Sequence, residues 1–181
     1  MKNIIDREMK LLWENDIAAD YDNGRLLKED SLKNAFYYHL RRRLGDVFLD
    51  EHDLQIYTEF DEGPLKGTGK RADLAIVKLN YEDDSEYWGE AVKEIVAIVE
   101  LKYKANRMAG EAIMSDVEKI HSYIVDNHID CQYYLGAIRE VDWDQDHYID
   151  EKSEWAIGRV TELVASYDEN EEMQFRVFET K

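Results

Sequence analysis

The first part of the chain carries apolar residues at the spacing of amphipathic helices. An apolar stripe predicts a helix over residues 2–20, and Gly24 suits the position that follows its last turn. A second helix is predicted over residues 26–44, where apolar side chains recur three and four positions apart and Gly45 provides a natural end. The chain therefore opens with two helices before any strand.

The middle of the chain changes to short apolar runs rich in β-branched and aromatic residues, which predict strands. These runs cover residues 54–60, 70–79, 95–104 and 132–138. The run 95–104 is nearly continuous in apolar residues, as is typical of a central strand that is buried on both faces. The glycine-rich stretch 61–69, which contains the only proline, predicts a loop.

Helical spacing returns over residues 109–127 and 154–167, and residues 174–179 predict an edge strand. The predicted order is α, α, β, β, β, α, β, α, β, which indicates one mixed sheet with helices packed around it. We expect a single domain over residues 1–181. Its parts are an N-terminal helix (1–24), a core (29–138) and a C-terminal helix with an edge strand (139–181).

Composition is that of a globular domain, with 181 residues of which 44% are hydrophobic and 12% aromatic. No apolar run approaches the roughly 18 residues that a membrane span needs, so we expect no membrane association. The charged first residues lack the apolar segment of a signal peptide, and a cytoplasmic location is expected. Cys131 is the lone cysteine, which excludes an internal disulfide and a multi-cysteine zinc site.

The net charge of −18 opposes the approach of nucleic acid at long range. The acidic charge is nevertheless uneven, because the first 107 residues contain four local clusters of bases. These lie within residues 25–33, 41–43, 66–71 and 102–107. Binding of a polyanion would require these clusters to converge in the folded chain.

Glu100 and Lys102 stand two positions apart in the run 95–104, so a strand directs both side chains to one face. An ionised group buried in a sheet costs several kcal/mol unless it is paired or bound to a metal. The simplest interpretation is an internal Glu100–Lys102 salt bridge near the end of the strand. Glu-x-Lys is a common tripeptide, so these two residues alone favour that interpretation.

Asp73 adds a third ionisable group to this arrangement. If strands 70–79 and 95–104 form an antiparallel hairpin, Asp73 lies opposite Glu100 and Lys102. Two carboxylates at one edge of an apolar sheet repel each other unless a cation lies between them. Hard oxygen donors with positions left for water and phosphate suit Mg²⁺, and a neighbouring lysine suits an anionic nucleophile or phosphate.

The set Asp73, Glu100 and Lys102, with a helix before its strands and a helix and another strand after them, resembles the PD-(D/E)XK nuclease superfamily. The likeness covers about residues 29–138 as an arrangement of elements, and Ala72 stands where the motif has proline. The resemblance implies a three-layer α/β restriction-endonuclease-like fold. Its mixed central sheet would belong to an αβββαβ core flanked by helices.

The resemblance also implies a metal-dependent phosphodiesterase. Asp73, Glu100 and the backbone carbonyl of Leu101 are then expected to hold Mg²⁺, with Mn²⁺ as an alternative. The metal would lower the pKa of a bound water, which Lys102 would position for in-line attack. Glu29 is expected to join this catalytic set, because it lies on the stripe of its helix that faces the sheet.

Residues around this set are candidates for further contacts. Glu59 ends its strand and is a candidate for the edge of the site. Lys119 and Tyr123 share a face of their helix, and we expect a solvated Lys119 and a core-packed Tyr123 rather than an approach to metal or nucleic acid. The candidates for phosphate contact are Lys70, Arg71, Lys104 and Arg107.

The favoured function is a metal-dependent nuclease that acts on nucleic acid, with DNA as the expected substrate, in defence, repair or a mobile-element context. A homodimer would supply the two sites needed to cut both strands of a duplex. The alternative is a catalytically inactive nuclease-like module that serves as an acidic binding or immunity protein, as the net charge favours. A third interpretation is a small structural domain in which Glu100 and Lys102 form only a salt bridge.

Overall fold

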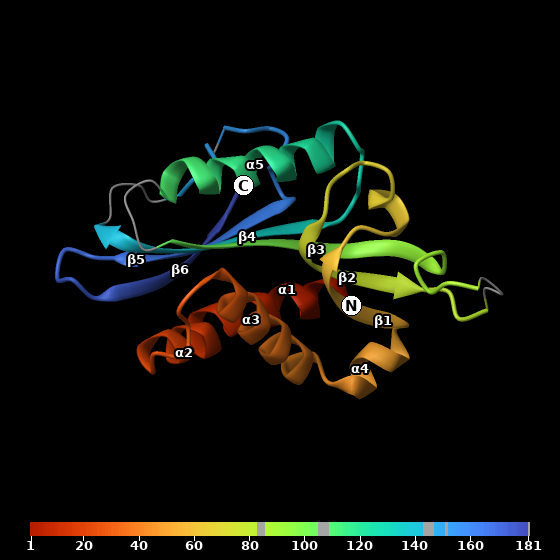
Figure 1. Ribbon diagram of the computed structural model, residues 1–181, viewed down its shortest axis with the longest axis horizontal. Helices are drawn as coiled ribbons and strands as arrows, with labels where there is room; N and C mark the ends of the chain where they lie inside the picture. The colour runs from red at the N-terminus through yellow and green to blue at the C-terminus, as the bar shows by residue number, and fades with distance from the viewer. Residues whose placement is uncertain (83–85, 105–108, 143–146, 151, 181) are drawn as a thin grey trace.

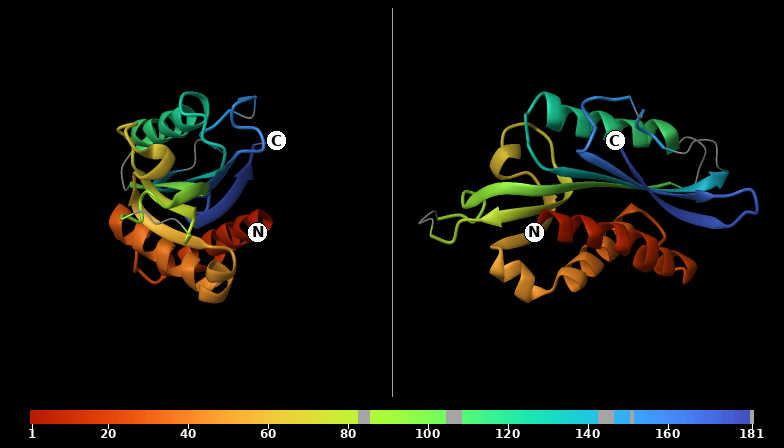
Figure 2. Two further views of the ribbon diagram at one scale, coloured as in Figure 1. Left: turned by 90° about the vertical axis from the view of Figure 1, so that its right-hand side faces the viewer. Right: turned by 180° about the vertical axis from the view of Figure 1, so that it is seen from behind.

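A six-stranded mixed sheet forms the centre of the molecule, with helices on both of its faces (Figure 1). The computed structural model describes the whole chain except residues 83–85, 105–108, 143–146, 151 and 181. Helix α5 (Ala109–Val125) covers one face of the sheet, and helices α1–α4 cover the other, as the two views of Figure 2 also show. No described helix is both long and apolar enough to cross a bilayer.

The predicted N-terminal helix is present but contains a wider π-helical turn. It consists of α1 (Lys2–Leu11), the π-helical segment η1 (Leu12–Ile17) and α2 (Ala18–Asp22). Helices α3 (Glu29–Leu44) and α4 (Asp46–Glu51) follow. Gly24 and Gly45 have φ angles of 66° and 76°, which confirms both as helix-ending residues in a conformation that favours glycine.

The strands follow the chain in spatial order from one edge of the sheet to the other. Pairing is antiparallel between β1 and β2, β2 and β3, and β5 and β6, and it is parallel between β3 and β4 and between β4 and β5. The short 3₁₀ helix η2 (Gly63–Leu65) lies in the predicted loop. The strands are β1 (Leu54–Phe60), β2 (Ala72–Leu79), β3 (Val92–Lys104), β4 (Gln132–Asp142), β5 (Val160–Tyr167) and β6 (Met173–Glu179).

The helix predicted over residues 154–167 is wrong, because residues 160–167 form strand β5. Val160, Leu163 and Val164 match helical spacing, but every residue from 160 to 166 is buried. A surface helix would leave part of this run in solvent, whereas a strand covered on both faces buries all of it. The sheet therefore accommodates the segment between β4 and β6, and the edge strand predicted at residues 174–179 is confirmed as β6.

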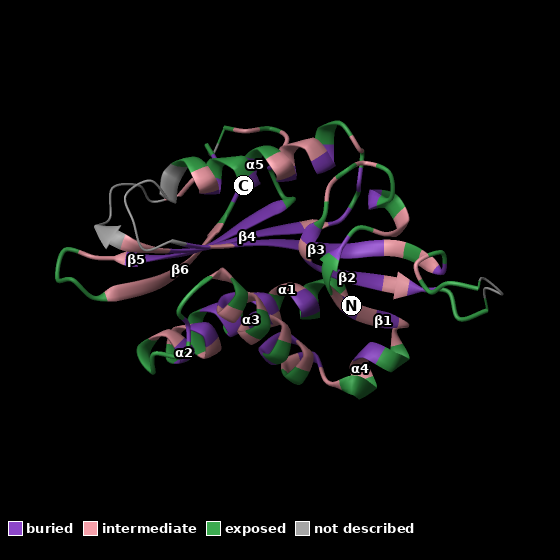
Figure 3. Ribbon diagram, viewed as in Figure 1, coloured by how far each residue is buried: buried purple, intermediate pink, exposed green. Residues whose placement is uncertain are grey.

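Strand β3 is central, as predicted, and its alternate residues face different helices. Ala97, Val99 and Leu101 belong to the apolar cluster under α1 and α3, whereas Ile98 belongs to the cluster under α5. Glu100 follows the same alternation and lies on the α5 side. Figure 3 shows that the middle of the sheet is buried almost throughout, so this carboxylate points into the core.

The sheet has a notch beside the last residues of β3. Strand β2 pairs with β3 only as far as Leu74 opposite Val99, whereas β3 continues to Lys104 along β4. In the described part of the chain, residues 100–104 of β3 therefore pair with a strand on one side only. Side chains from α3 and α5 reach the sheet at this notch.

Close packing between β3, β4 and the N-terminal helix gives the first testable prediction. A Cβ atom at Gly136 on β4 would lie 2.5 Å from Cδ2 of the buried Leu101 and 3.6 Å from Cζ3 of Trp13. Gly136→Ala should therefore lower the free energy of unfolding by about 1–3 kcal/mol, since Leu101 must leave its packed position. Urea denaturation measures the loss. The same change should cost less in a Leu101→Ala background, and equal costs in both backgrounds would contradict the steric explanation.

Candidate functional site

Asp73 occupies the position where β2 begins and where β3 loses its antiparallel neighbour. The backbone N–H of Leu101 has no strand partner there and donates to Oδ2 of Asp73 at 2.7 Å. A buried N–H without an acceptor is costly, so the carboxylate replaces the missing strand. Asp73 is thereby fixed beside Glu100, as the predicted hairpin requires.

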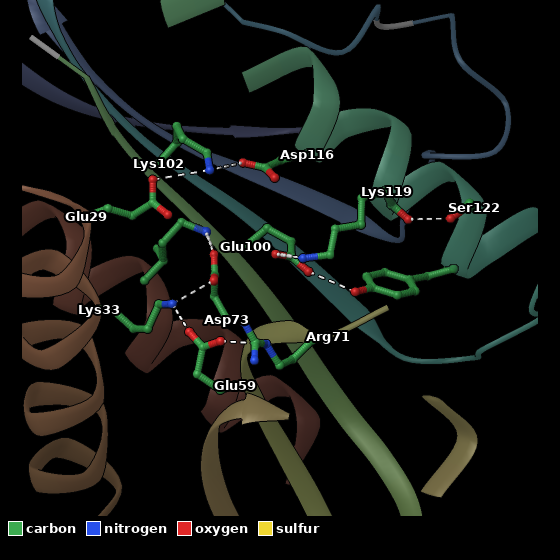
Figure 4. Close-up of polar contacts among 12 residues, drawn as sticks. Glu29, Lys33, Glu59, Arg71, Asp73, Glu100, Lys102, Asp116, Lys119 and Ser122 are labelled. Carbon is green, nitrogen blue, oxygen red and sulfur yellow. Dashed lines mark hydrogen bonds and ion pairs between the residues drawn. The ribbon is translucent and has the colours of Figure 1, made fainter. Parts of the chain in front are cut away.

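The other oxygen of Asp73 faces α3. Nζ of Lys33 lies 2.9 Å from Oδ1 of Asp73 and also pairs with the carboxylate of Glu59. Arg71, just before β2, pairs with the second oxygen of Glu59 at 2.6 Å. These pairs form a continuous chain from β1 through α3 to β2 (Figure 4). Glu59 therefore lies at the edge of the site, as predicted.

Glu100 is completely buried, with an exposed fraction of 0%, and both of its oxygens contact α5. Nζ of Lys119 donates to Oε2 at 2.7 Å, and the hydroxyl of Tyr123 donates to Oε1 at 3.1 Å. The expectation of a solvated Lys119 is wrong, because this lysine reaches into the notch. Tyr123 is packed in the core as expected, and its hydroxyl also contacts the carboxylate.

Electrostatics disfavour the charged form of Glu100. Burial raises the pKa of this carboxyl to about 8, the charge of Lys119 opposes the shift, and the nearby Asp73 and Asp116 add to it. One ammonium group therefore does not offset the loss of water and the two anionic neighbours. Additional positive charge at the notch would favour the ionised carboxylate.

Lys102 lies between two carboxylates that come from opposite faces of the sheet. Its Nζ is 3.2 Å from Oε2 of Glu29 on α3 and 3.2 Å from Oδ2 of Asp116 on α5. Lys102 and Glu100 do not form the simple salt bridge with each other, since each of them pairs with side chains from other elements. Glu29 faces the sheet, as predicted, and contacts Lys102, while its catalytic role stays a prediction.

The protonation states of Lys102 and Asp116 depend on each other. Burial alone lowers the pKa of Lys102, but Asp116 and Glu29 raise it overall. Asp116 is itself buried, and burial raises its pKa although Lys102 acts in the opposite direction. Lys102 is thus held as a cation at a fixed place in the notch.

The predicted nucleic-acid contacts divide into two groups. Lys70 donates to Oδ1 of Asn127 at 3.0 Å and lies 5.9 Å from the centre of the Tyr123 ring, while Arg71 keeps a mostly exposed side chain beside Glu59. Lys104 belongs to β3, but its side chain, like the whole of Arg107, lies outside the described part of the structure. The phosphate contacts at all four positions remain predictions.

Sequence reasoning missed Asp116 and Lys33. Asp116 carries a recognisable signal, because it precedes Lys119 by three residues and Tyr123 by seven and therefore shares their helix face. Three polar side chains on the sheet-facing side of an otherwise apolar helix indicate a common polar partner. Lys33 offers no such signal, since its partners come from strands far away in the sequence.

Asp73 and Glu100 are the two carboxylates that would hold a divalent cation, and the backbone of Leu101 lies beside both of them. Their oxygens are hard donors, as Mg²⁺ prefers. A cation bound nearby would favour the ionised form of Glu100 and lower the elevated pKa of this carboxyl. No cluster of three or more histidine, cysteine, aspartate or glutamate residues with metal-binding arrangement is found among the described residues.

The buried carboxyl generates a pH-dependent prediction. Between its ordinary pKa of 4.5 and its folded pKa of about 8, Glu100 keeps a proton that the unfolded chain releases. The free energy of unfolding therefore falls as pH rises through this window. In the absence of divalent metal, the free energy of unfolding of Glu100→Gln, relative to that of the native chain, should rise by a few kcal/mol from pH 5 to pH 9.

Thermal or urea unfolding at pH 5, 7 and 9 in the presence of a chelator measures this difference. Glu94→Gln, on the exposed part of the same strand, is the matched control and should follow the native chain at each pH. A constant difference between Glu100→Gln and the native chain across the range would contradict an elevated pKa at Glu100.

Comparisons with known proteins do not assign the chain to a family. No family model matches it, and no significant match is found among curated proteins or among solved structures. Function must therefore be inferred from the residues and geometry of the notch.

Proposed function

We propose that the protein is a metal-dependent nuclease with its active site in the notch beside β3. The observation that carries the proposal is the convergence of Asp73, Glu100 and Lys102 at one point, where α3 and α5 both contribute polar side chains. The succession of a helix, three antiparallel strands, a helix and a parallel strand also supports a restriction-endonuclease-like core.

Asp73 and Glu100, with the carbonyl of Leu101, would hold Mg²⁺ or Mn²⁺. A bound divalent cation supplies an acidified water and neutralises phosphate charge. The chain's own part is to place two carboxylates together and to keep bulk water away from one of them. Because Glu100 is protonated over much of the neutral range, loading with metal would release a proton.

Lys102 would act as a fixed cation rather than as a base. Its pKa is raised by Asp116 and Glu29, so it keeps its proton at neutral pH. An ammonium group held at the notch orients an attacking water and stabilises negative charge on the phosphate. Asp116 and Glu29 are then positioning residues that hold Lys102 from the two faces of the sheet.

Arg71 would receive the substrate backbone. Its side chain is 61% exposed, and its present partner Glu59 is also open to solvent. Surface ion pairs of this kind contribute little to stability, so a phosphate can compete for the guanidinium group. The net charge of −18 predicts that binding is weak overall and depends on such local contacts.

An inactive binding module is the second candidate. The observation that favours it is that each carboxylate of the notch already has a cationic or hydrogen-bonding partner within the chain. A self-contained network of this kind can stabilise a fold without metal. Metal binding separates the two candidates directly.

Calorimetric titration with Mg²⁺ and Mn²⁺ is the first test. We predict binding by the native chain with release of a proton near pH 7, which appears as a dependence of the enthalpy on the buffer. Glu100→Gln should lose the binding, and Glu94→Gln should retain it. No binding by the native chain would contradict the nuclease proposal and favour the binding module.

Lys102→Ala separates chemistry from metal binding. We predict that this variant still binds metal, since both carboxylates remain, but loses about 10²-fold or more in cleavage of labelled DNA because its fixed cation is gone. Cleavage is measured on duplex, single-stranded and branched substrates. Lys93→Ala, on the same strand away from the notch, is the control, and equal activity in both variants would exclude the role given to Lys102.

A further inference from the structure

A hollow of about 220 Å³ lies beside the notch, between the end of β1 and the connection from β2 to β3. Its walls include the rings of Tyr57 and Phe60, which stack on each other with centres 5.9 Å apart. Trp88, from the connection, forms another wall and is 65% exposed. The volume is below the roughly 300–1,000 Å³ of pockets for drug-sized ligands, so the hollow suits one planar group.

Carboxylates surround these aromatic walls. Oε2 of Glu62 is shielded from solvent and accepts no hydrogen bond from the described residues, and Nζ of Lys66 lies 3.7 Å from it. A Cβ atom at Gly89 would lie 2.9 Å from that oxygen, so glycine allows the connection to lie against Glu62. The acidic edge repels phosphate, but it suits a neutral ring that bears N–H donors.

Glu59 joins this hollow to the proposed active site. It lines the hollow, and its carboxylate pairs with Lys33 and Arg71 beside Asp73. Glu59 also has a φ angle of 53°, although its neighbours Thr58 and Phe60 remain paired with β2. A left-handed conformation is uncommon for a glutamate and often marks a functional position.

We propose that the hollow binds an unpaired nucleobase of the substrate, so that the site acts on single-stranded or locally unpaired nucleic acid. This inference rests on the proposed nuclease function. The base stacks on the exposed ring of Trp88 and its N–H groups face the carboxylates, while the adjoining phosphate points toward Arg71 and Lys33. A base within a duplex cannot enter, because its faces are covered by its neighbours in the stack.

Stacking also provides an attraction to nucleic acid that does not depend on the net charge of the chain. An acidic chain gains little from the general attraction to phosphate that supports most duplex binding. Aromatic side chains bind bases through their π faces, which single strands expose and duplexes conceal. A strongly exposed tryptophan next to an acidic active site therefore favours unpaired strands over duplexes.

Binding in the absence of metal tests the proposal without requiring cleavage. A fluorescently labelled 12-nucleotide single-stranded DNA and a fully paired duplex of the same sequence are titrated with the native chain in a chelator at low salt. The native chain should bind the single strand more tightly than the duplex. Trp88→Ala should weaken single-strand binding roughly tenfold to a hundredfold and leave the weak duplex binding unchanged.

Tyr87→Ala is the matched control, because Tyr87 is also 65% exposed and adjacent in sequence but does not line the hollow. Equal losses in the two variants, or equal affinity of the native chain for single strand and duplex, would overturn the inference. Metal-dependent cleavage that is insensitive to Trp88→Ala would leave the nuclease proposal standing and remove the base-binding hollow. Selective binding without metal affinity would support the hollow and remove the nuclease.

Discussion

The hydrogen bond from the Leu101 N–H to Asp73 fixes the geometry on which the site depends. It closes the sheet at the point where β2 begins, and it does so with a side chain instead of a strand. If β2 extended two residues further along β3, backbone pairing would fill the notch. The side chains of α3 and α5 would then be separated by the sheet, and Lys102 could not contact Glu29 and Asp116 together.

The same constraint explains which parts of the site were predictable. Two apolar runs that follow each other in the chain are expected to pair antiparallel, and their pairing at Leu74 and Val99 brings Asp73 next to Glu100. The connection over residues 80–91 is too long to set this register, so the register depends on burial of the apolar faces. Glu29 was predictable for a similar local reason, since helical periodicity determines which residues of α3 face the sheet. These contacts need only one element or one pair of neighbouring strands.

The parts of the site and of the fold that the sequence did not predict depend on contacts between segments far apart in the chain. Lys33 meets Glu59 and Asp73 only because α3 crosses beneath the ends of β1 and β2, which no local pattern encodes. The wrong prediction of a helix at residues 154–167 has the same origin. Helical spacing of the apolar residues in β5 is real, but pairing with β4 and β6 determines the structure and buries Thr161, Glu162 and Ser166 as well.

Glu100 is the residue that stability alone explains least. Buried ion pairs are often no more stabilising than apolar groups of the same size, so a chain with apolar residues in place of both Glu100 and Lys119 would fold at least as well. The ammonium group of Lys119 does not overcome the effect of burial, since the pKa of Glu100 remains near 8. By contrast, Asp73 has a structural task, because it accepts a hydrogen bond from an otherwise unpaired N–H. Stability explains the carboxylate of Asp73 but not that of Glu100, so Glu100 is the stronger indication of a function. A cation bound beside Glu100 would also change the free energy of the notch most, because it would favour the ionised form of this buried carboxyl.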